Sequence, residues 1–284
     1  MKSNLLRYPG GKTKLLPIIM KYLSPLLNES DSFCEPFIGG GSVLLEVATK
    51  YPNHKLYIND KDYGIYSIWK VLSSSNKEDI IELCKLISIE PTIDYFYKLR
   101  DCEPNNIVES AYQAIFFNRC CFSGINITRE KIDKNGNVKI FKSNPIGGKD
   151  QQSKYKVNCR YNSKKLINQI TNINKILIGR TVVDNLDCIE YISKKNDIPM
   201  YCDPPYWFKA EDLYNTYMDK NEHIYLSNIL FELKKWVLSY DNCIEIKDIY
   251  KWANIYEIDA KYSINSNNVE WKNIKELLIV STKK

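Results

Sequence analysis

The segment Tyr201–Trp207, "YCDPPYW", holds the residues whose types and spacing best suit chemistry. An apolar stretch precedes it, and because the two prolines cannot continue a β-ladder, the chain must leave the sheet at Asp203. In open α/β folds, ligands bind at this carboxyl edge of the sheet. The Asp203 carboxylate and the Pro204 carbonyl offer two acceptors beside the flat ring of Tyr206, which suits the exocyclic amino group of a planar base. The structural alternative is a rigid turn with a capping acid.

A glycine-rich loop, "EPFIGGGS" at Glu35–Ser42, lies between an expected strand and an expected helix. Its glycines allow a ligand to approach the backbone closely, and the helix N-terminus favours an anionic group. Asp60 ends the next expected strand, about 20 residues further on, where an acid accepts hydrogen bonds from ribose hydroxyls. The loop does not match G-x-G-x-x-G, so a nicotinamide enzyme is not the first expectation.

A third motif, "RYPGGKTKLL" at Arg7–Leu16, is similar to a phosphate-binding loop. That loop needs a glycine where this chain has Leu6, and it must follow a buried strand, which is missing here. A nucleotide hydrolase is therefore disfavoured. The Gly-Gly-Lys turn can still present Lys12 and backbone donors to a carboxylate, although a plain N-terminal loop is the alternative.

The elements that position these motifs alternate between strand and helix in the first and last parts of the chain. Strands are expected at 33–34, 55–60, 180–185 and 236–240, and within 198–207, where the strand breaks at its prolines. A closing hairpin is expected at 255–264 and 276–282. Helices are expected after Thr13 as a cap and up to Ser24-Pro25 as a stop, and at 43–48, 65–72, 188–195 and 222–235. The first strand, glycine loop, helix and second strand form a βαβ unit, which predicts an α/β fold.

From about Ser73 the alternation of strand and helix patterns gives way to successive helical patterns. Helical patterns follow at Glu78–Ile87, Ile93–Arg100 and Ile107–Cys121, then a hairpin signal in "DKNGNVKIF" and a helix over 162–177. Between Arg119 and Lys165, 12 lysines and arginines stand against three acids. We therefore predict a catalytic domain of residues 1–72 and 166–284, interrupted by a helical, basic insertion at 73–165.

Composition excludes several classes of protein. The chain has 284 residues, of which 44% are hydrophobic and 26% charged, as in ordered globular proteins. Its net charge of +6 is compatible with a nucleic-acid partner without being diagnostic. No apolar run approaches the roughly 20 residues of a membrane helix and the first residues lack a signal-peptide pattern, so we expect a cytoplasmic protein. Nine cysteines without C-x-x-C spacing and two histidines predict free thiols and no metal site.

The motifs "RYPGGK", "EPFIGGGS", "IND" and "DPPY", in this order, resemble the Dam-like (D12 class) adenine-N6 DNA methyltransferases, and "FFNRCCFSGI" and "SYDN" resemble that family too. The resemblance implies a Rossmann-like sheet with helices on both faces that uses S-adenosylmethionine, together with a target-recognition insertion. It implies a target-base site of Asp203, Pro204, Pro205 and Tyr206. The implied cofactor site comprises Tyr8, Gly10, Lys12, Glu35, Pro36, Phe37, Gly39, Gly40, Gly41, Ser42, Asp60, Asp187, Cys188 and Asp203. Family members usually have an aromatic residue where Cys188 stands.

The implied reaction is direct transfer of a methyl group to N6 of an adenine flipped out of double-stranded DNA. For DNA contacts we expect Arg119, Phe122, Ser123, Asn126, Arg129, Lys131 and Lys142. The last three would hold phosphates, and the loop 119–126 would read bases. The Arg-Tyr-Asn segment that follows this loop at once in the best-known members occurs here only at Cys159–Asn162, so a GATC target is not assumed.

Alternatives stay open at this point. N4-cytosine or RNA methylation suits the same proline-aromatic motif, and a DNA-binding regulator with a decayed site is a different class. We expect a monomer in a bacterium or phage-infected host, with a cognate restriction endonuclease as a further candidate partner.

Overall fold

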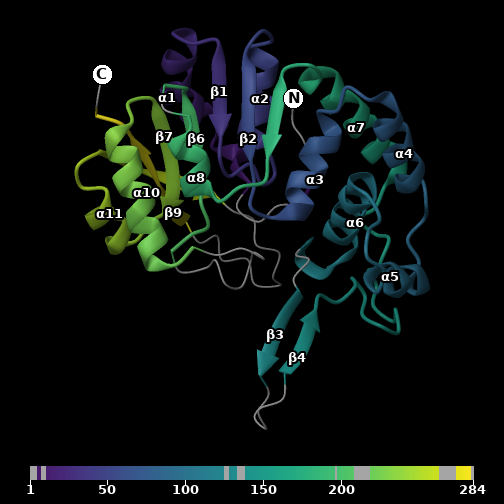
Figure 1. The fold of residues 1–284 in the computed structure, drawn as a ribbon. Coiled ribbons are helices and arrows are strands. Elements are labelled where there is room, and N and C mark those ends of the chain that lie inside the picture. Colours follow the sequence, from purple (N-terminus) through teal and green to yellow (C-terminus); the bar gives the residue numbers. More distant parts are fainter. Residues whose placement is uncertain are drawn as a thin grey trace.

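A seven-stranded sheet forms the centre of the computed structural model, which describes residues 5–7, 11–124, 128–132, 138–195, 197–207, 218–261 and 273–282 (Figure 1). Its strands are β1 (Ser32–Glu35), β2 (Lys55–Asn59), β5 (Thr181–Asp184), β6 (Met200–Cys202), β7 (Trp236–Asp241), β8 (Asn254–Lys261) and β9 (Asn273–Val280). They lie in the order β5-β2-β1-β6-β7-β9-β8. All neighbours pair in parallel except β9, which is antiparallel to β7 and β8. The chain thus builds outward from β1 and returns to its other side as β6, which creates a switch point between β1 and β6.

Helices cover both faces of this sheet. Their bounds are α1 (Leu16–Asn28), α2 (Ser42–Lys50), α3 (Tyr63–Leu72), α4 (Lys77–Ile87), α5 (Ile93–Arg100), α6 (Ile107–Cys120), α7 (Ser163–Leu177), α8 (Cys188–Ser193), α10 (Lys220–Glu232) and α11 (Ile244–Ile249). Neighbouring strand residues point to opposite faces: Phe33 and Tyr201 join the core under α1, α2, α3 and α7, while Cys34 and Cys202 join the core under α8, α10 and α11. The predicted α/β fold with helices on both faces is therefore confirmed.

The middle of the chain is helical and ends in a hairpin. Helices α4, α5 and α6 follow α3, and β3 (Thr128–Ile132) pairs antiparallel with β4 (Val138–Lys142), as the Asn-Gly signal predicted. The hairpin stands away from the sheet in Figure 1. Leu83, Phe96 and Phe116 share one buried cluster with residues of α1 and α2, so the core is continuous across residue 73. The division into two domains stays a prediction.

Two local predictions were wrong. Helix α1 does not stop at Ser24-Pro25 but continues to Asn28 with Pro25 inside it. Leu27 is fully buried, and burying a leucine contributes about 1.5–3 kcal/mol, which offsets the hydrogen bond that proline cannot donate. Thr13 does not cap this helix: it lies in the short turn Lys12–Lys14, and its hydroxyl is 3.3 Å from that of Ser42. Helix α11 was not predicted.

No helix among the described residues combines the length and apolarity needed to cross a membrane.

Candidate active site

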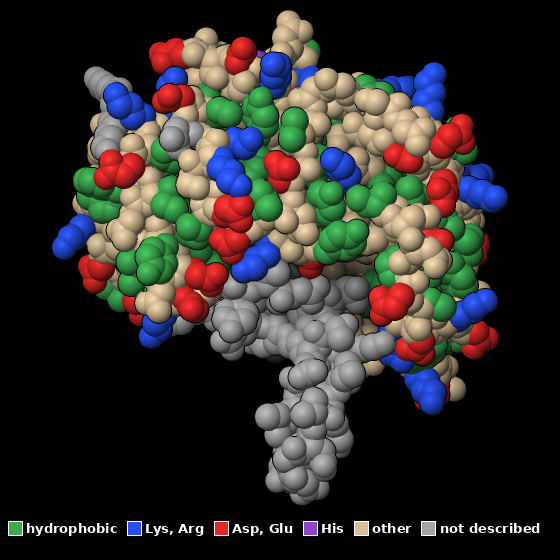
Figure 2. All heavy atoms as spheres, in the orientation of Figure 1, with side chains coloured by type: hydrophobic (Ala, Val, Ile, Leu, Met, Phe, Trp, Pro, Cys, Tyr) green, Lys and Arg blue, Asp and Glu red, His purple; other side chains and the backbone are tan. Residues whose placement is uncertain are grey.

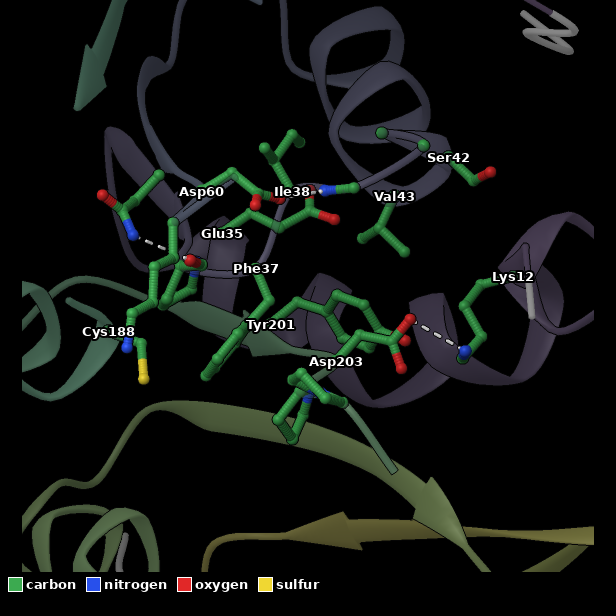
Figure 3. A pocket seen from close by; sticks show the side chains of 18 of the residues that line it. Lys12, Glu35, Phe37, Ile38, Ser42, Val43, Asp60, Cys188, Tyr201 and Asp203 are labelled. Carbon is green, nitrogen blue, oxygen red and sulfur yellow. Dashed lines mark hydrogen bonds and ion pairs between the residues drawn. The ribbon is translucent and has the colours of Figure 1, made fainter. Parts of the chain in front are cut away.

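The carboxyl ends of β1, β2 and β6 open into a cavity that is continuous with solvent (Figure 3). It brings together most of the predicted site residues: Lys12, Glu35, Pro36, Phe37, Gly39, Gly40, Gly41, Ser42, Asp60, Asp187, Cys188, Asp203, Pro204 and Pro205. Tyr206 lies beside this set, with its ring centroid 5.2 Å from the Lys12 Nζ. Tyr8 and Gly10 lie outside the described residues. Residues far apart in the chain thus meet at the switch point, where open α/β sheets bind ligands.

The glycine loop between β1 and α2 is held from below by Trp69 of α3. The Trp69 indole Nε1 donates a hydrogen bond of 2.9 Å to the Gly39 carbonyl. Gly41 has a φ of +65°, in the left-handed region, and a Cβ added to it would overlap the indole ring. The φ of Gly41 and the position of the Trp69 ring thus require glycine here. The sequence analysis found the loop but missed Trp69, because a tryptophan in an amphipathic helix looks like any core residue.

Asp60 ties the second strand to the same loop. Its Oδ2 accepts from the Gly39 N–H and its Oδ1 from the Asp62 N–H, both at 2.9 Å. Burial, and then the nearby Asp62, raise the pKa of Asp60 to about 7, against the lowering effect of these two backbone donors. The neighbouring Asn59 is fully buried and donates to the Pro36 and Leu186 carbonyls, each at 3.1 Å. The "IND" motif therefore joins the ends of three strands.

Asp203 is held at both carboxylate oxygens. Its Oδ2 is 2.8 Å from Nζ of Lys12, which is only 4% exposed, and its Oδ1 accepts a 2.9 Å hydrogen bond from the Ser239 hydroxyl. Tyr201 OH lies 2.7 Å from the same Ser239 oxygen. Burial, and then Asp203, raise the pKa of Tyr201 well above its usual value, so the phenol keeps its proton. Because Ser239 donates its single proton to Asp203, Tyr201 must donate to Ser239, and the chain of donors runs in one direction.

One carboxyl oxygen of the buried Glu35 lacks a hydrogen-bond partner among the described residues. This oxygen is Oε2, and the residue is 3% exposed. Burial, and then Asp203, raise the pKa of Glu35 well above its usual range, against smaller lowering effects of the Leu44 backbone N–H and of Lys12. A buried carboxyl oxygen without a partner is costly, so this position favours a cationic ligand or a hydrogen-bond donor.

Asp187 and Cys188 form the opposite end of the cavity. Asp187 caps α8 through the Ile189 N–H, at 3.0 Å, and pairs with Lys61, at 3.1 Å. Burial raises the pKa of the Cys188 thiol to about 12, so the sulfur stays protonated and serves as a small apolar wall. Lining residues that the sequence analysis missed are Gly11, Ile38, Val43, Asn59, Lys61, Tyr201, Met218 and Glu222. Asn59 and Lys61 flank Asp60 and were within reach of motif reasoning, whereas nothing local marks Met218 or Glu222.

The residues predicted to contact DNA lie outside this cavity. Arg119 donates through Nε and Nη2 to the Leu5 carbonyl, at 3.0 and 2.6 Å, and Phe122 is 72% exposed. The remaining predicted contacts fall on elements or gaps as follows: Ser123 lies in the turn Phe122–Gly124, Arg129 and Lys131 in β3, Lys142 in β4, and Asn126 outside the described residues. Basic and acidic side chains are interspersed on the face shown in Figure 2, so charge alone does not mark a DNA surface there.

The sequence of the chain is similar to those of known methyltransferases. The family described as D12 class N6 adenine-specific DNA methyltransferase matches residues 8–264. The chain is 28% identical over 301 aligned residues to Type II methyltransferase M.MjaIII of Methanocaldococcus jannaschii, covering 97% of this chain and 98% of that protein. It is 25% identical over 294 aligned residues to Type II methyltransferase M1.LlaDCHI of Lactococcus lactis subsp. cremoris, covering 97% and 94%.

Proposed function

The chain belongs to the D12 class of N6 adenine-specific DNA methyltransferases, and from that premise we propose that its cavity moves a methyl group from S-adenosylmethionine to N6 of an adenine rotated out of double-stranded DNA. Membership makes the protein an enzyme that methylates adenine in DNA with a methyl donor. We propose in addition that the donor is S-adenosylmethionine, that the substrate is double-stranded DNA, and that the cavity residues have the roles given below. The observation that carries it is that Asp203, the glycine loop and Asp60 line one cavity at the switch point of the sheet.

The charges of the cavity suit S-adenosylmethionine, which carries a sulfonium and an ammonium group. Five acids, Glu35, Asp60, Asp187, Asp203 and Glu222, line it with two lysines, Lys12 and Lys61. The unpartnered Oε2 of Glu35 offers an acceptor for a cationic group. Burial, and then Asp203, raise the pKa of Glu35, and a bound cation would oppose both effects. Asp60 would accept from the ribose hydroxyls, and Asp187 and Cys188 would flank the adenine of the donor. These residues therefore fit the group.

Bound S-adenosylmethionine supplies an electrophilic methyl group on its sulfur. Asp203 and the Pro204 carbonyl would accept the two N6 protons of the target adenine, which aligns its nitrogen with that methyl. The Asp203 carboxylate would also stabilise the positive charge that develops on N6. Stacking on Tyr206 would offset part of the few kcal/mol needed to unstack the base. Lys12 and Ser239 keep the carboxylate in one orientation.

DNA contacts are proposed for the region 73–165. Phe122, exposed at the end of α6, and the hairpin β3–β4 with Arg129, Lys131 and Lys142 are the candidates for holding the duplex. The two relatives are named type II methyltransferases, and on that basis we propose a role in restriction-modification with a cognate endonuclease. We further propose that the enzyme acts as a monomer in the cytoplasm of a bacterium or phage-infected host, where its DNA substrate lies.

The direct test is transfer of tritium from labelled S-adenosylmethionine to duplex DNA by the purified protein, followed by analysis of the modified nucleosides. We expect N6-methyladenine. N4-methylcytosine as the product, or preferential transfer to RNA, would establish one of the alternative targets. Absence of transfer with DNA binding retained would identify a decayed regulator.

Ser239→Ala is expected to slow transfer by about tenfold to a hundredfold with S-adenosylmethionine affinity unchanged. A hydrogen bond to a charged group contributes about 1.5–3 kcal/mol, and without it the Asp203 carboxylate can rotate away from the adenine amine. Tyr201→Phe removes only the outer donor and should cost less, and Ser239→Thr, which keeps the hydroxyl, should retain most activity. Single-turnover rates and calorimetric affinities separate the two quantities. A Ser239→Ala rate equal to the parental rate would show that Asp203 needs no support.

Binding of S-adenosylmethionine should weaken by about fivefold as Asp60 takes up its proton, between roughly pH 8 and pH 6. Hydrogen bonds from ribose hydroxyls to a carboxylate are stronger by about 1 kcal/mol than those to a neutral acid. The stability of the unliganded protein depends on pH in the opposite direction. Because the folded pKa of Asp60 is raised, its contribution to stability is full below its unfolded pKa and is lost as pH rises through about 7. Calorimetric affinities of the parent and of Asp60→Asn at both pH values provide the check. An equal pH dependence in the two proteins would contradict the assignment.

A further inference from the structure

The N-terminal residues Leu5–Arg7 are held by the end of helix α6, more than a hundred positions away. The Asn118 side chain makes three hydrogen bonds: its Oδ1 accepts from the Arg7 N–H at 2.7 Å, and its Nδ2 donates to the Arg7 carbonyl at 3.0 Å and to the Gly124 carbonyl at 2.9 Å. Asn118 is 8% exposed, and both protons of its amide are used. We call Leu5–Arg7 with Asn118, Arg119 and Gly124 the N-terminal clamp.

Further contacts reinforce the clamp from both sides. Arg119 donates twice to the Leu5 carbonyl, and Arg7 Nη1 donates to the Cys121 carbonyl at 3.3 Å. A Cβ added to Gly124 would come within 2.9 Å of the Arg7 carbonyl, so this glycine permits the close approach of the two backbones. Burial, and then Arg7, lower the pKa of Arg119 to about 10, so the two guanidinium groups repel. Hydrogen bonds rather than charge pairing therefore hold the clamp together.

The clamp stands close along the chain to two functional parts of the molecule. Arg7 is five positions before Lys12, a tether of at most about 17 Å when fully extended. Lys12 forms the ion pair with Asp203 in the cavity. On its other side, Gly124 closes the turn Phe122–Gly124, which leads into the hairpin proposed to contact DNA.

We propose that Asn118 is a positioning residue for methyl transfer: by holding the backbone of Arg7 it sets where Lys12 meets Asp203, and it links the DNA-side turn to the target-base site. The proposal rests on the proposed roles of Lys12 and Asp203. It assigns to Arg119 the holding of Leu5, whereas the sequence analysis expected it to read bases.

A double-mutant cycle of Asn118 and Lys12 tests the proposal. Asn118→Ala should lower the single-turnover rate by about tenfold without changing the affinity for S-adenosylmethionine. If Asn118 acts through Lys12, the double variant Asn118→Ala/Lys12→Ala transfers no more slowly than Lys12→Ala alone. Losses that multiply would overturn the proposal, because Asn118 would then act independently of Lys12. A Lys12→Ala rate equal to the parental rate would overturn the proposed role of Lys12, and with it the clamp's effect.

Two further variants keep the result interpretable. Asn118→Asp has the same shape and keeps the acceptor for the Arg7 N–H but loses both donors. It therefore takes the place of Asn118→Ala in the cycle with Lys12→Ala if the alanine variant does not fold. Gln113→Ala removes a 3.0 Å hydrogen bond from the same helix to the Cys102 carbonyl, away from the clamp, and should retain parental activity. Arg119→Ala distinguishes the two roles of that residue: as part of the clamp it should show the same non-additivity with Lys12→Ala, whereas as a base reader it should change target choice and DNA affinity.

Discussion

Asp203→Ala protein is expected to bind S-adenosylmethionine with near-parental affinity and to transfer its methyl group about a hundredfold to a thousandfold more slowly. Losses of this size follow when one preorganised group that stabilises transition-state charge is removed. Here the change deletes an acceptor for the amine of the target adenine. It also breaks the ion pair of Lys12, whose side chain is almost fully buried, with the Asp203 carboxylate. Single-turnover transfer to duplex DNA and calorimetric binding of the donor measure the two effects separately.

The matched control for Asp203→Ala is Asp184→Ala. Asp184 also ends a parallel strand of the sheet, β5, but it does not line the cavity. Because its half-buried side chain does not line the cavity, its replacement should leave the transfer rate within about twofold of the parent. An Asp203→Ala enzyme that still methylates DNA at a near-parental rate would remove Asp203 from the reaction and, with it, the proposed site.

Gly41→Ala should reduce both the stability and the affinity for S-adenosylmethionine. An alanine at a φ of +65° costs about 1–2 kcal/mol, and forcing its methyl group against the Trp69 indole adds about 1–3 kcal/mol. The free energy of unfolding should therefore fall by about 2–5 kcal/mol, unless the loop shifts away from Trp69, in which case the cofactor site is distorted instead. Denaturant unfolding and calorimetric binding of the donor measure the two outcomes.

Gly179→Ala separates backbone strain from overlap. Gly179 has a φ of +76°, but a Cβ added there meets no atom within 4 Å. We expect a loss of about 1–2 kcal/mol from strain alone and no change in donor affinity. If Gly41→Ala and Gly179→Ala were equally stable and bound the donor equally well, Trp69 would not be shaping the glycine loop.

Much of the fold could be predicted because its signals are local. Thr92, Asn106 and Asn162 each cap the helix that follows them through a side-chain oxygen, and the helix bounds match the expected ones closely. Where a distant contact outweighs a local preference, prediction failed. Pro25 stays in a helix because the next turn buries Leu27 against the core, and that burial is invisible in a stretch of a few residues.

In the candidate site, too, the residues with local signals were predicted and those that depend on distant contacts were missed. The glycine loop, Asp60 and Asp203 were found because each stands where a strand must end, which fixes its side chain at the carboxyl edge of the sheet. Met218 and Glu222 complete the cavity from the start of α10, and no short motif announces them. Trp69 and Ser239 were missed for a different reason: a core tryptophan and a strand serine are common, and only their neighbours give them a role.

By itself, the order of residues determined the α/β alternation, the strand ends that carry the glycine loop, Asp60 and Asp203, and the kinship with adenine methyltransferases, because backbone sterics and short-range hydrogen bonds act within a few positions. Only the tertiary structure decided which of these ends meet, that Lys12 pairs with Asp203, and that Asn118 holds Arg7. Such contacts join segments more than a hundred positions apart. They form only when whole helices and strands pack together, and no local pattern records that packing.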